Sequence, residues 1–305
     1  MTDSSLLEKS ALAMALLGNM IFALSSIFFT EFSRKRSTLW MNTFKALIAL
    51  ASFSFTALLL RLSLPMSPFI LICLLASGAM GLMIGDIFLL TAYTRIGPAR
   101  TLMIFGFTPI FLGLSSRYLF GQEFPFYKLT AVVCLMACLF SFSLERFRAD
   151  GHWEWRGLLF GFTGVFLDAC GLLLTKSAFA NGTLSGQEIH PAMVNAIRCA
   201  GALAIVPLVS VFLRHRIGIV TGFRTLTHRE RIQVLVASFC GTFLSLLLYL
   251  SAIKVGHMAS VSAVAMTSPV FASLFECWRL KVWPNLYLLV GLFFFCLGLG
   301  ILFLF

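Results

Sequence analysis

The chain has 305 residues, of which 59% are hydrophobic and only 11% are charged, and its mean hydropathy is +0.96. A soluble protein of this length could not bury so much apolar surface, whereas a bilayer accepts apolar side chains on the outside of a fold. The net charge of +11 does not indicate nucleic-acid binding, because the Lys and Arg residues lie between apolar runs, as loop cations beside membrane spans do. The composition therefore predicts an all-α integral membrane protein whose surroundings are the lipid bilayer.

Ten apolar runs approach or exceed the roughly 20 residues that cross a bilayer as a helix. We therefore expect ten transmembrane helices, separated into two groups of five by the most polar connector, residues 144–155. In chain order the expected spans lie near 10–31, 38–60, 67–93, 98–119, 126–143, 156–178, 190–213, 231–253, 258–279 and 284–305.

A short motif in the fourth expected span returns in the ninth. Residues 107–111 read FTPIF, and residues 267–271, which lie 160 positions later, read TSPVF. The motif places Pro109 and Pro269 at equivalent points, where each proline removes an intrahelical hydrogen bond. We expect both prolines to kink their helices or to free a carbonyl group.

The repeated motif divides the chain into two related halves. We expect a first five-helix repeat at 1–143, a connector at 144–155 and a second five-helix repeat at 156–305. Because five is an odd number, the second repeat must enter the membrane in the opposite sense. Such inverted repeats are typical of secondary transporters.

Within the second expected span, Asn42 and Lys45 are three residues apart and share one helix face. Asn195 and Arg198 repeat this pair in the seventh span, 153 positions later. A charge at mid-membrane costs about 2.5–3.5 kcal/mol on insertion scales, so it usually faces a cavity or a partner. We expect these four residues to bind substrate. The alternative is that both cations extend to the membrane surface.

Asp168 lies on a face of the sixth expected span that also carries Gly161, Gly164 and Gly171. Glycines at this spacing allow a neighbouring helix to approach closely. The face is therefore either a packing seam, in which Asp168 pairs with a cation such as Arg198, or a functional site.

Asp86 lies in the third expected span and has no acidic counterpart, since Leu246 stands 160 positions later. It is either a coupling group for an ion or proton, or the ion-pair partner of Lys45. A buried acid can take up a proton near neutral pH, whereas a guanidinium keeps its proton. The candidates for proton coupling are therefore Asp168 first and Asp86 second.

Ten spans in two repeats, with Lys45 and Arg198 in spans two and seven and Pro109 and Pro269 in spans four and nine, resemble the drug/metabolite transporter superfamily, specifically its EamA-type exporters. The resemblance covers the whole chain. It implies a central substrate cavity between the repeats, alternating access, and small solutes such as amino acids or other metabolites as substrates. The inner membrane of a bacterial-type cell is the expected location, and a homodimer is left open.

The orientation of the chain has two readings. The odd-numbered loops hold 15 of the 21 loop cations, which by the positive-inside rule places both termini outside. The resemblance implies that both termini are cytoplasmic.

Other function classes have less support in the sequence. No HExxH or GxSxG motif, P-loop or CxxC pair occurs, and all five His residues lie in or beside loops. We therefore expect no cofactor, no metal and no enzymatic activity. The alternatives to a secondary transporter are an integral-membrane enzyme and an uncoupled facilitator of small solutes.

Overall fold

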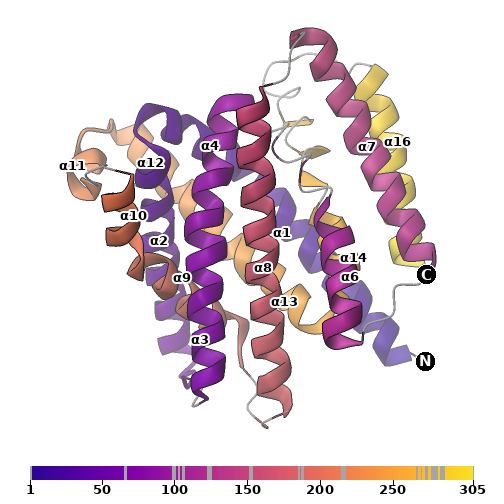
Figure 1. The fold of residues 1–305 in the computed structure, drawn as a ribbon, viewed down its shortest axis with the longest axis horizontal. Coiled ribbons are helices and arrows are strands. Elements are labelled where there is room, and N and C mark those ends of the chain that lie inside the picture. Colours follow the sequence, from indigo (N-terminus) through magenta and orange to yellow (C-terminus); the bar gives the residue numbers. More distant parts are fainter. Residues whose placement is uncertain are drawn as a thin grey trace.

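In a computed structural model, the chain is an all-α membrane protein (Figure 1). The structure describes residues 2–64, 67–97, 101, 104, 107–121, 126–150, 154–184, 186, 189–213, 218–265, 267–268, 270–271, 274–275, 281 and 286–304. The first part of the chain forms α1 (Thr2–Lys35), α2 (Thr38–Leu59), α3 (Pro68–Ser77), η1 (Gly78–Gly85), α4 (Asp86–Ile96), α6 (Thr108–Phe120) and α7 (Phe126–Asp150). The second part forms α8 (Trp155–Leu184), α9 (Pro191–Ala204), α10 (Val206–Phe212), α11 (Ile219–Arg224), α12 (His228–Ser238), η3 (Phe239–Leu244), α13 (Ser245–Val255), α14 (Met258–Ala265) and α16 (Leu286–Leu304).

Six helices in the described part of the chain are long and apolar enough to cross a membrane. The other four expected spans fall where α6, α7, α14 and α16 lie, next to residues that the structure does not describe. The six helices are Leu7–Lys35, Thr38–Leu59, Pro68–Ile96, Trp155–Leu184, Pro191–Phe212 and His228–Val255.

Local sequence signals fix several helix starts. The hydroxyl of Ser37 accepts a hydrogen bond from the backbone N–H of Trp40 at the start of α2. Thr227 and Glu230 form a reciprocal capping box at the start of α12. Pro68 and Pro191 occupy the first turns of α3 and α9, where the missing proline N–H leaves no hydrogen bond unmade.

Two of the long helices are not α-helical throughout. The helix from Pro68 to Ile96 contains the π-helical segment η1, and the helix from His228 to Val255 contains η3. The two segments are equivalent in the repeat, since Gly81 of η1 lies 160 positions before Gly241 of η3. The hydrophobic pattern did not predict them, although π-helical turns are frequent at functional sites.

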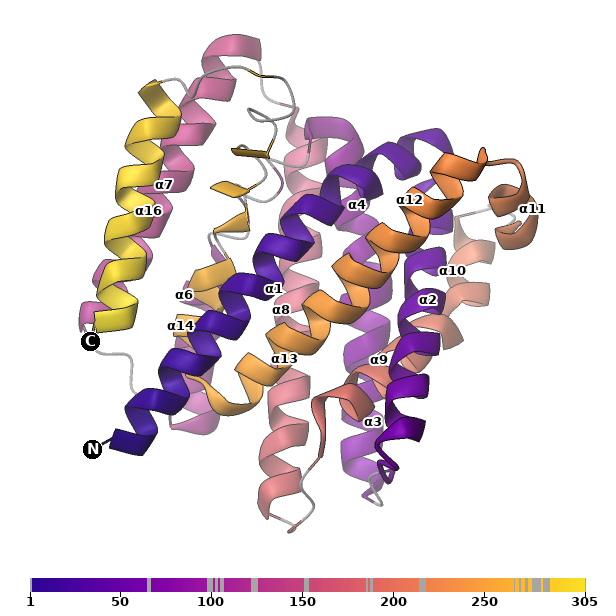
Figure 2. The ribbon, with the colours of Figure 1, turned by 180° about the vertical axis from the view of Figure 1, so that it is seen from behind.

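The two halves pack into one another. The α4 helix lies against α8 and α13 lies against α1, while α2 and α9 contact each other between these pairs. The glycine face of α8 is a close seam: a Cβ atom on Gly164 would lie 2.9 Å from the carbonyl oxygen of Gly85 and 2.7 Å from the Cγ of Leu89. Figures 1 and 2 both show α7 and α16 side by side at one edge of the bundle.

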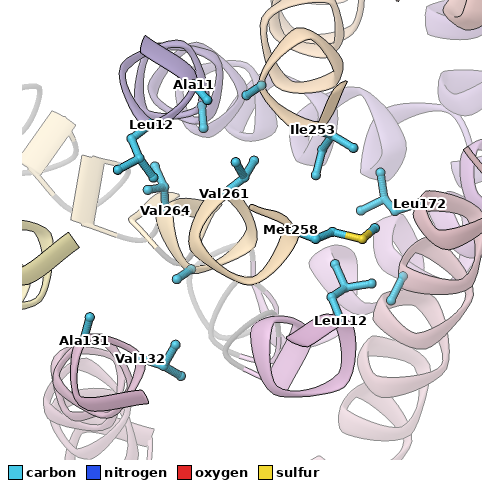
Figure 3. Packing of buried hydrophobic residues seen from close by; sticks show 14 residues of the cluster. Ala11, Leu12, Leu112, Ala131, Val132, Leu172, Ile253, Met258, Val261 and Val264 are labelled. Atoms are coloured by element: carbon cyan, nitrogen blue, oxygen red, sulfur yellow. The ribbon is translucent and has the colours of Figure 1, made fainter. Parts of the chain in front are cut away.

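The two ends of α1 are held by different kinds of contact. Near the N-terminal part of α1, an apolar cluster that includes Leu12, Val261 and Leu112 fills the space between α1, α14 and α6 (Figure 3). At the other end of α1, Lys35 forms an ion pair with Glu230 of α12. These contacts leave a polar site in the middle of the bundle.

Candidate functional site

A cavity of about 90 Å³ lies between helices of both halves. Its walls come from α1, α2, η1, α4, α6, α8, α9, η3 and α13, together with Ser268. The charged residues that line it are Lys45, Asp86, Asp168 and Arg198. The apolar and aromatic side chains of the lining are Phe22, Leu82, Leu89, Leu172, Leu246 and Tyr249. The four ionisable residues that the sequence indicated therefore share one cavity, and the side chains of both cations are buried inside the protein.

Lys45 is paired with an acid of its own half. Its Nζ atom lies 2.7 Å from Oδ2 of Asp86, and the lysine side chain is only 5% exposed. The same ammonium lies 5.3 Å from the ring centre of Phe29, close enough for a cation–π contact. The ion-pair alternative for Asp86 is therefore the arrangement found in this structure.

Arg198 is fully buried, and its guanidinium is paired differently. Its Nε–H donates to the hydroxyl of Ser77 at 2.9 Å, whereas Nη1 and Nη2 have no hydrogen-bond partner among the described residues. Leaving buried charged donors unsatisfied costs more than leaving neutral ones. Two free donor groups at a cavity wall are suited to a bound anion.

Asp168 faces the same space. It makes no hydrogen bond and no ion pair with the described residues. Its Oδ1 atom lies 3.4 Å, and Nη2 of Arg198 lies 3.7 Å, from the point where a Cβ atom on Gly81 would stand. The direct pairing of Asp168 with Arg198, which was one of the two alternatives, is thus not formed among the described residues. The structure instead presents two opposite charges near each other at the cavity.

Asn42 and Asn195 are placed elsewhere. The side-chain amide of Asn42 donates to the carbonyl oxygens of Leu82 at 3.0 Å and Met83 at 3.2 Å, both in η1. The amide of Asn195 donates to the carbonyl oxygen of Leu246 at 3.3 Å, just after η3. Neither residue lines the cavity. Their hydrogen bonds hold α2 and α9 to the helices that contain the π-helical segments.

The repeated proline motif contributes through its hydroxyl residues. Thr108 and Ser268, which precede the two prolines and are 160 positions apart, both line the cavity. Pro109 lies in the first turn of α6 as the structure describes it, and residues 102–103 and 105–106 before it lie outside the described residues, so the kink at this proline stays a prediction. Pro269 lies outside the described residues.

Sequence reasoning missed Ser77, Thr108, Thr242 and Ser268. The hydroxyls of Thr108 and Thr242 are buried at the cavity without a partner among the described residues. Position beside a repeated proline was a signal for Thr108 and Ser268. Ser77 carried no signal of its own, because its role depends on which helices pack together.

The fold and this cavity define a multi-pass integral membrane protein with a polar site between its helices. Residues 9–144 and 155–304 each match the EamA-like transporter family, so the chain belongs to that family. Membership confirms the resemblance drawn from the sequence and indicates a small-molecule transporter.

Comparison with solved structures gives 28 matching chains. One of them, described only as "Crystal structure of protein", has a TM-score of 0.76 and 14% sequence identity, with 96% of each chain covered. At this identity the likeness concerns the fold alone. A comparison with curated proteins gave no match.

Proposed function

We propose that the protein is a secondary transporter that exports small metabolites, such as amino acids or related compounds, across the cell inner membrane by alternating access. The observation that carries this proposal is the central cavity, where Arg198 offers two unpartnered amino groups and Asp168 an unpaired carboxylate. Family membership supports transport of small molecules.

The charges around the cavity favour a zwitterionic substrate. Lys45 and Asp86 neutralise each other, which leaves Arg198 and Asp168 to contact a ligand. A guanidinium binds a carboxylate through two parallel hydrogen bonds, and an aspartate can accept hydrogen bonds from an ammonium group. The apolar wall around Leu172 is suited to a hydrophobic substituent.

Alternating access requires two units that can move against each other. The equivalent contacts of α4 with α8 and of α13 with α1 support a twofold relation between residues 1–143 and 156–305 in the membrane plane. The pairs α6 with α14 and α7 with α16 fit the same relation. We infer ten spans in two inverted five-helix repeats, joined by residues 144–155.

Coupling to a proton gradient is assigned to Asp168. A coupling group must change its protonation state during the cycle, which Arg198 does not do at biological pH. Asp86 already holds the ammonium of Lys45, whereas Asp168 has no ion-pair partner among the described residues. Asp168 is therefore the first candidate, and a substrate ammonium would compete with a proton for it.

The test is transport by the purified protein in liposomes, against a panel of amino acids and related metabolites, with and without a proton gradient. We expect transport of at least one zwitterion, and we expect Arg198→Gln to raise its KM by about 10- to 100-fold through loss of a charged hydrogen-bonding group. An Arg198→Gln variant that transports every compound like the parent protein would contradict the proposed site. Transport that equilibrates substrate but never responds to the gradient would identify a facilitator.

A further inference from the structure

We propose that Ser77 is the positioning residue of the substrate site: its hydroxyl fixes the guanidinium of Arg198 so that Nη1 and Nη2 face the cavity. This inference rests on the proposed function, since it assumes that Arg198 binds the anionic group of the substrate. It adds a residue that lies outside the cavity lining and acts through Arg198.

The chemistry of the partners fixes the direction of the Ser77 hydrogen bonds with Gly171 and Arg198. The Ser77 Oγ lies 2.6 Å from the carbonyl oxygen of Gly171, which can only accept, and 2.9 Å from Nε of Arg198, which can only donate. A lone pair of the hydroxyl therefore receives the Nε–H, and the single hydroxyl proton is available to the carbonyl oxygen of Gly171 or to Oγ1 of Thr175. Thr175, whose Oγ1 lies 2.8 Å from Ser77 Oγ, also donates to the carbonyl oxygen of Gly171, but among the described residues it forms no hydrogen bond with Arg198. Ser77 and Arg198 are both fully buried.

Holding Nε determines where the rest of the guanidinium points. The group is planar and rigid, so a hydrogen bond at Nε restricts the orientation of its plane and leaves the N–H groups of Nη1 and Nη2 for other partners. Both Nη atoms lack a partner in the described part of the chain, and Arg198 lines the cavity. A substrate carboxylate that binds bidentately to Nη1 and Nη2 does not use the Nε–H. The serine satisfies that remaining N–H group.

The backbone is built to allow this contact. Gly78 follows Ser77, and a Cβ atom on Gly78 would overlap the backbone carbonyl of Arg198. Only glycine permits η1 and α9 to approach so closely. Since Ser77 and Arg198 come from different halves of the chain, the hydrogen bond also links the two halves at the cavity.

The two cations have different surroundings because the residues that correspond to Asp86 and Ser77 differ in the second half of the chain. The counterpart of Asp86 is Leu246, so Arg198 has no acid where Lys45 has one. The counterpart of Ser77 is Ala237, so the same hydroxyl is not offered to Lys45. One cation is therefore neutralised by an acid, whereas the other is oriented by a hydroxyl and keeps its charge available.

The experiment compares Ser77→Ala with Thr175→Val, which removes a neighbour of the serine hydroxyl but no contact to Arg198. Transport is measured in liposomes for the best panel substrate, and competition is measured with that compound and with its carboxamide. We expect Ser77→Ala to raise the KM for the carboxylate about 10-fold with little change in maximal rate, and to reduce the preference for carboxylate over carboxamide. Ser77→Thr, which keeps a hydroxyl, should retain that preference, and Thr175→Val should resemble the parent.

A second readout needs no substrate. In protein labelled with ¹⁵N-arginine, the Nε–H resonance of Arg198 is identified by its loss in Arg198→Lys. We expect Ser77→Ala to shift this resonance and to speed its exchange with water, while Thr175→Val leaves it in place. An unchanged resonance in Ser77→Ala would overturn the positioning role. Should Arg198→Gln keep full transport while Ser77→Ala still shifts the resonance, the proposed function fails and the contact is only structural.

Discussion

Lys45 and Arg198 occupy equivalent positions in the two halves, yet they have different partners at one cavity. Lys45 forms an ion pair with Asp86 at 2.7 Å, whereas Arg198 donates to a serine hydroxyl and keeps two donor groups unpartnered in the described part of the protein. The cavity is thus built by a repeat but is electrostatically asymmetric. A single asymmetric substrate, with one acidic and one basic group, fits such a site better than a symmetric one.

Breaking the ion pair should cost stability. We expect Lys45→Ala or Asp86→Asn to lower the free energy of unfolding by about 3 kcal/mol, the low end for a buried pair because this one borders a cavity. The double variant Lys45→Met with Asp86→Leu should recover most of this loss, since it leaves no uncompensated charge. Thermal unfolding in detergent measures both effects. A double variant less stable than either single variant would show that the pair does more than neutralise charge.

Asp168 should be essential for coupling transport to the proton gradient. We expect Asp168→Asn to abolish accumulation of substrate driven by a proton gradient, because the amide cannot take up and release a proton. Counterflow exchange of the same substrate should remain measurable in liposomes.

Asp86→Asn is the matched comparison, since Asp86 lines the same cavity but is already paired. Accumulation against the gradient by both variants, at the parental level, would exclude either acid as the proton carrier. The two acids would then be packing residues of an exchanger or facilitator.

The close contact at Gly78 should tolerate no side chain. We expect Gly78→Ala to destabilise the fold by about 3 kcal/mol, because the added methyl group must separate two backbones and not merely displace a flexible side chain. Gly300→Ala, at a site with open space around the added atom, should be close to neutral. The thermal unfolding midpoints of the two variants test this, and the midpoint of Gly78→Ala should be the lower one. Equal midpoints would contradict the close contact at Gly78.

The amide of Asn42 should matter for the π-helical segment it holds. Asn42→Ala removes the donor to two carbonyl groups of η1, and leaving buried acceptors unsatisfied costs about 1–3 kcal/mol. Asn19→Ala is the control, because among the described residues the Asn19 amide donates within its own helix, to the carbonyl oxygen of Ala15. Faster amide hydrogen exchange in η1 of the Asn42 variant, but not of the Asn19 variant, is the expected result.

The sequence predicted the residues that border the site better than the way they are held. Charges are costly in lipid, so their rarity within apolar runs singled out Lys45, Asp86, Asp168 and Arg198, and all four border the cavity, whereas Asn42 and Asn195 do not. A π-helical segment adds one residue to a turn and leaves the apolar pattern unchanged, which is why η1 and η3 had no signal. The contact between Ser77 and Arg198 depends on which helix faces which, and that information is tertiary.

The different partners of Lys45 and Arg198 have a consequence for the origin of the protein by duplication. A symmetric pair of first halves would place two neutralised lysines around the cavity and no available cation. A symmetric pair of second halves would place two arginines and two copies of Asp168 there, with Leu246 and Ala237 at the positions of Asp86 and Ser77, so neither arginine would have the serine that orients it. Neither ancestral arrangement has the present site, so the two halves have become complementary and are no longer interchangeable copies.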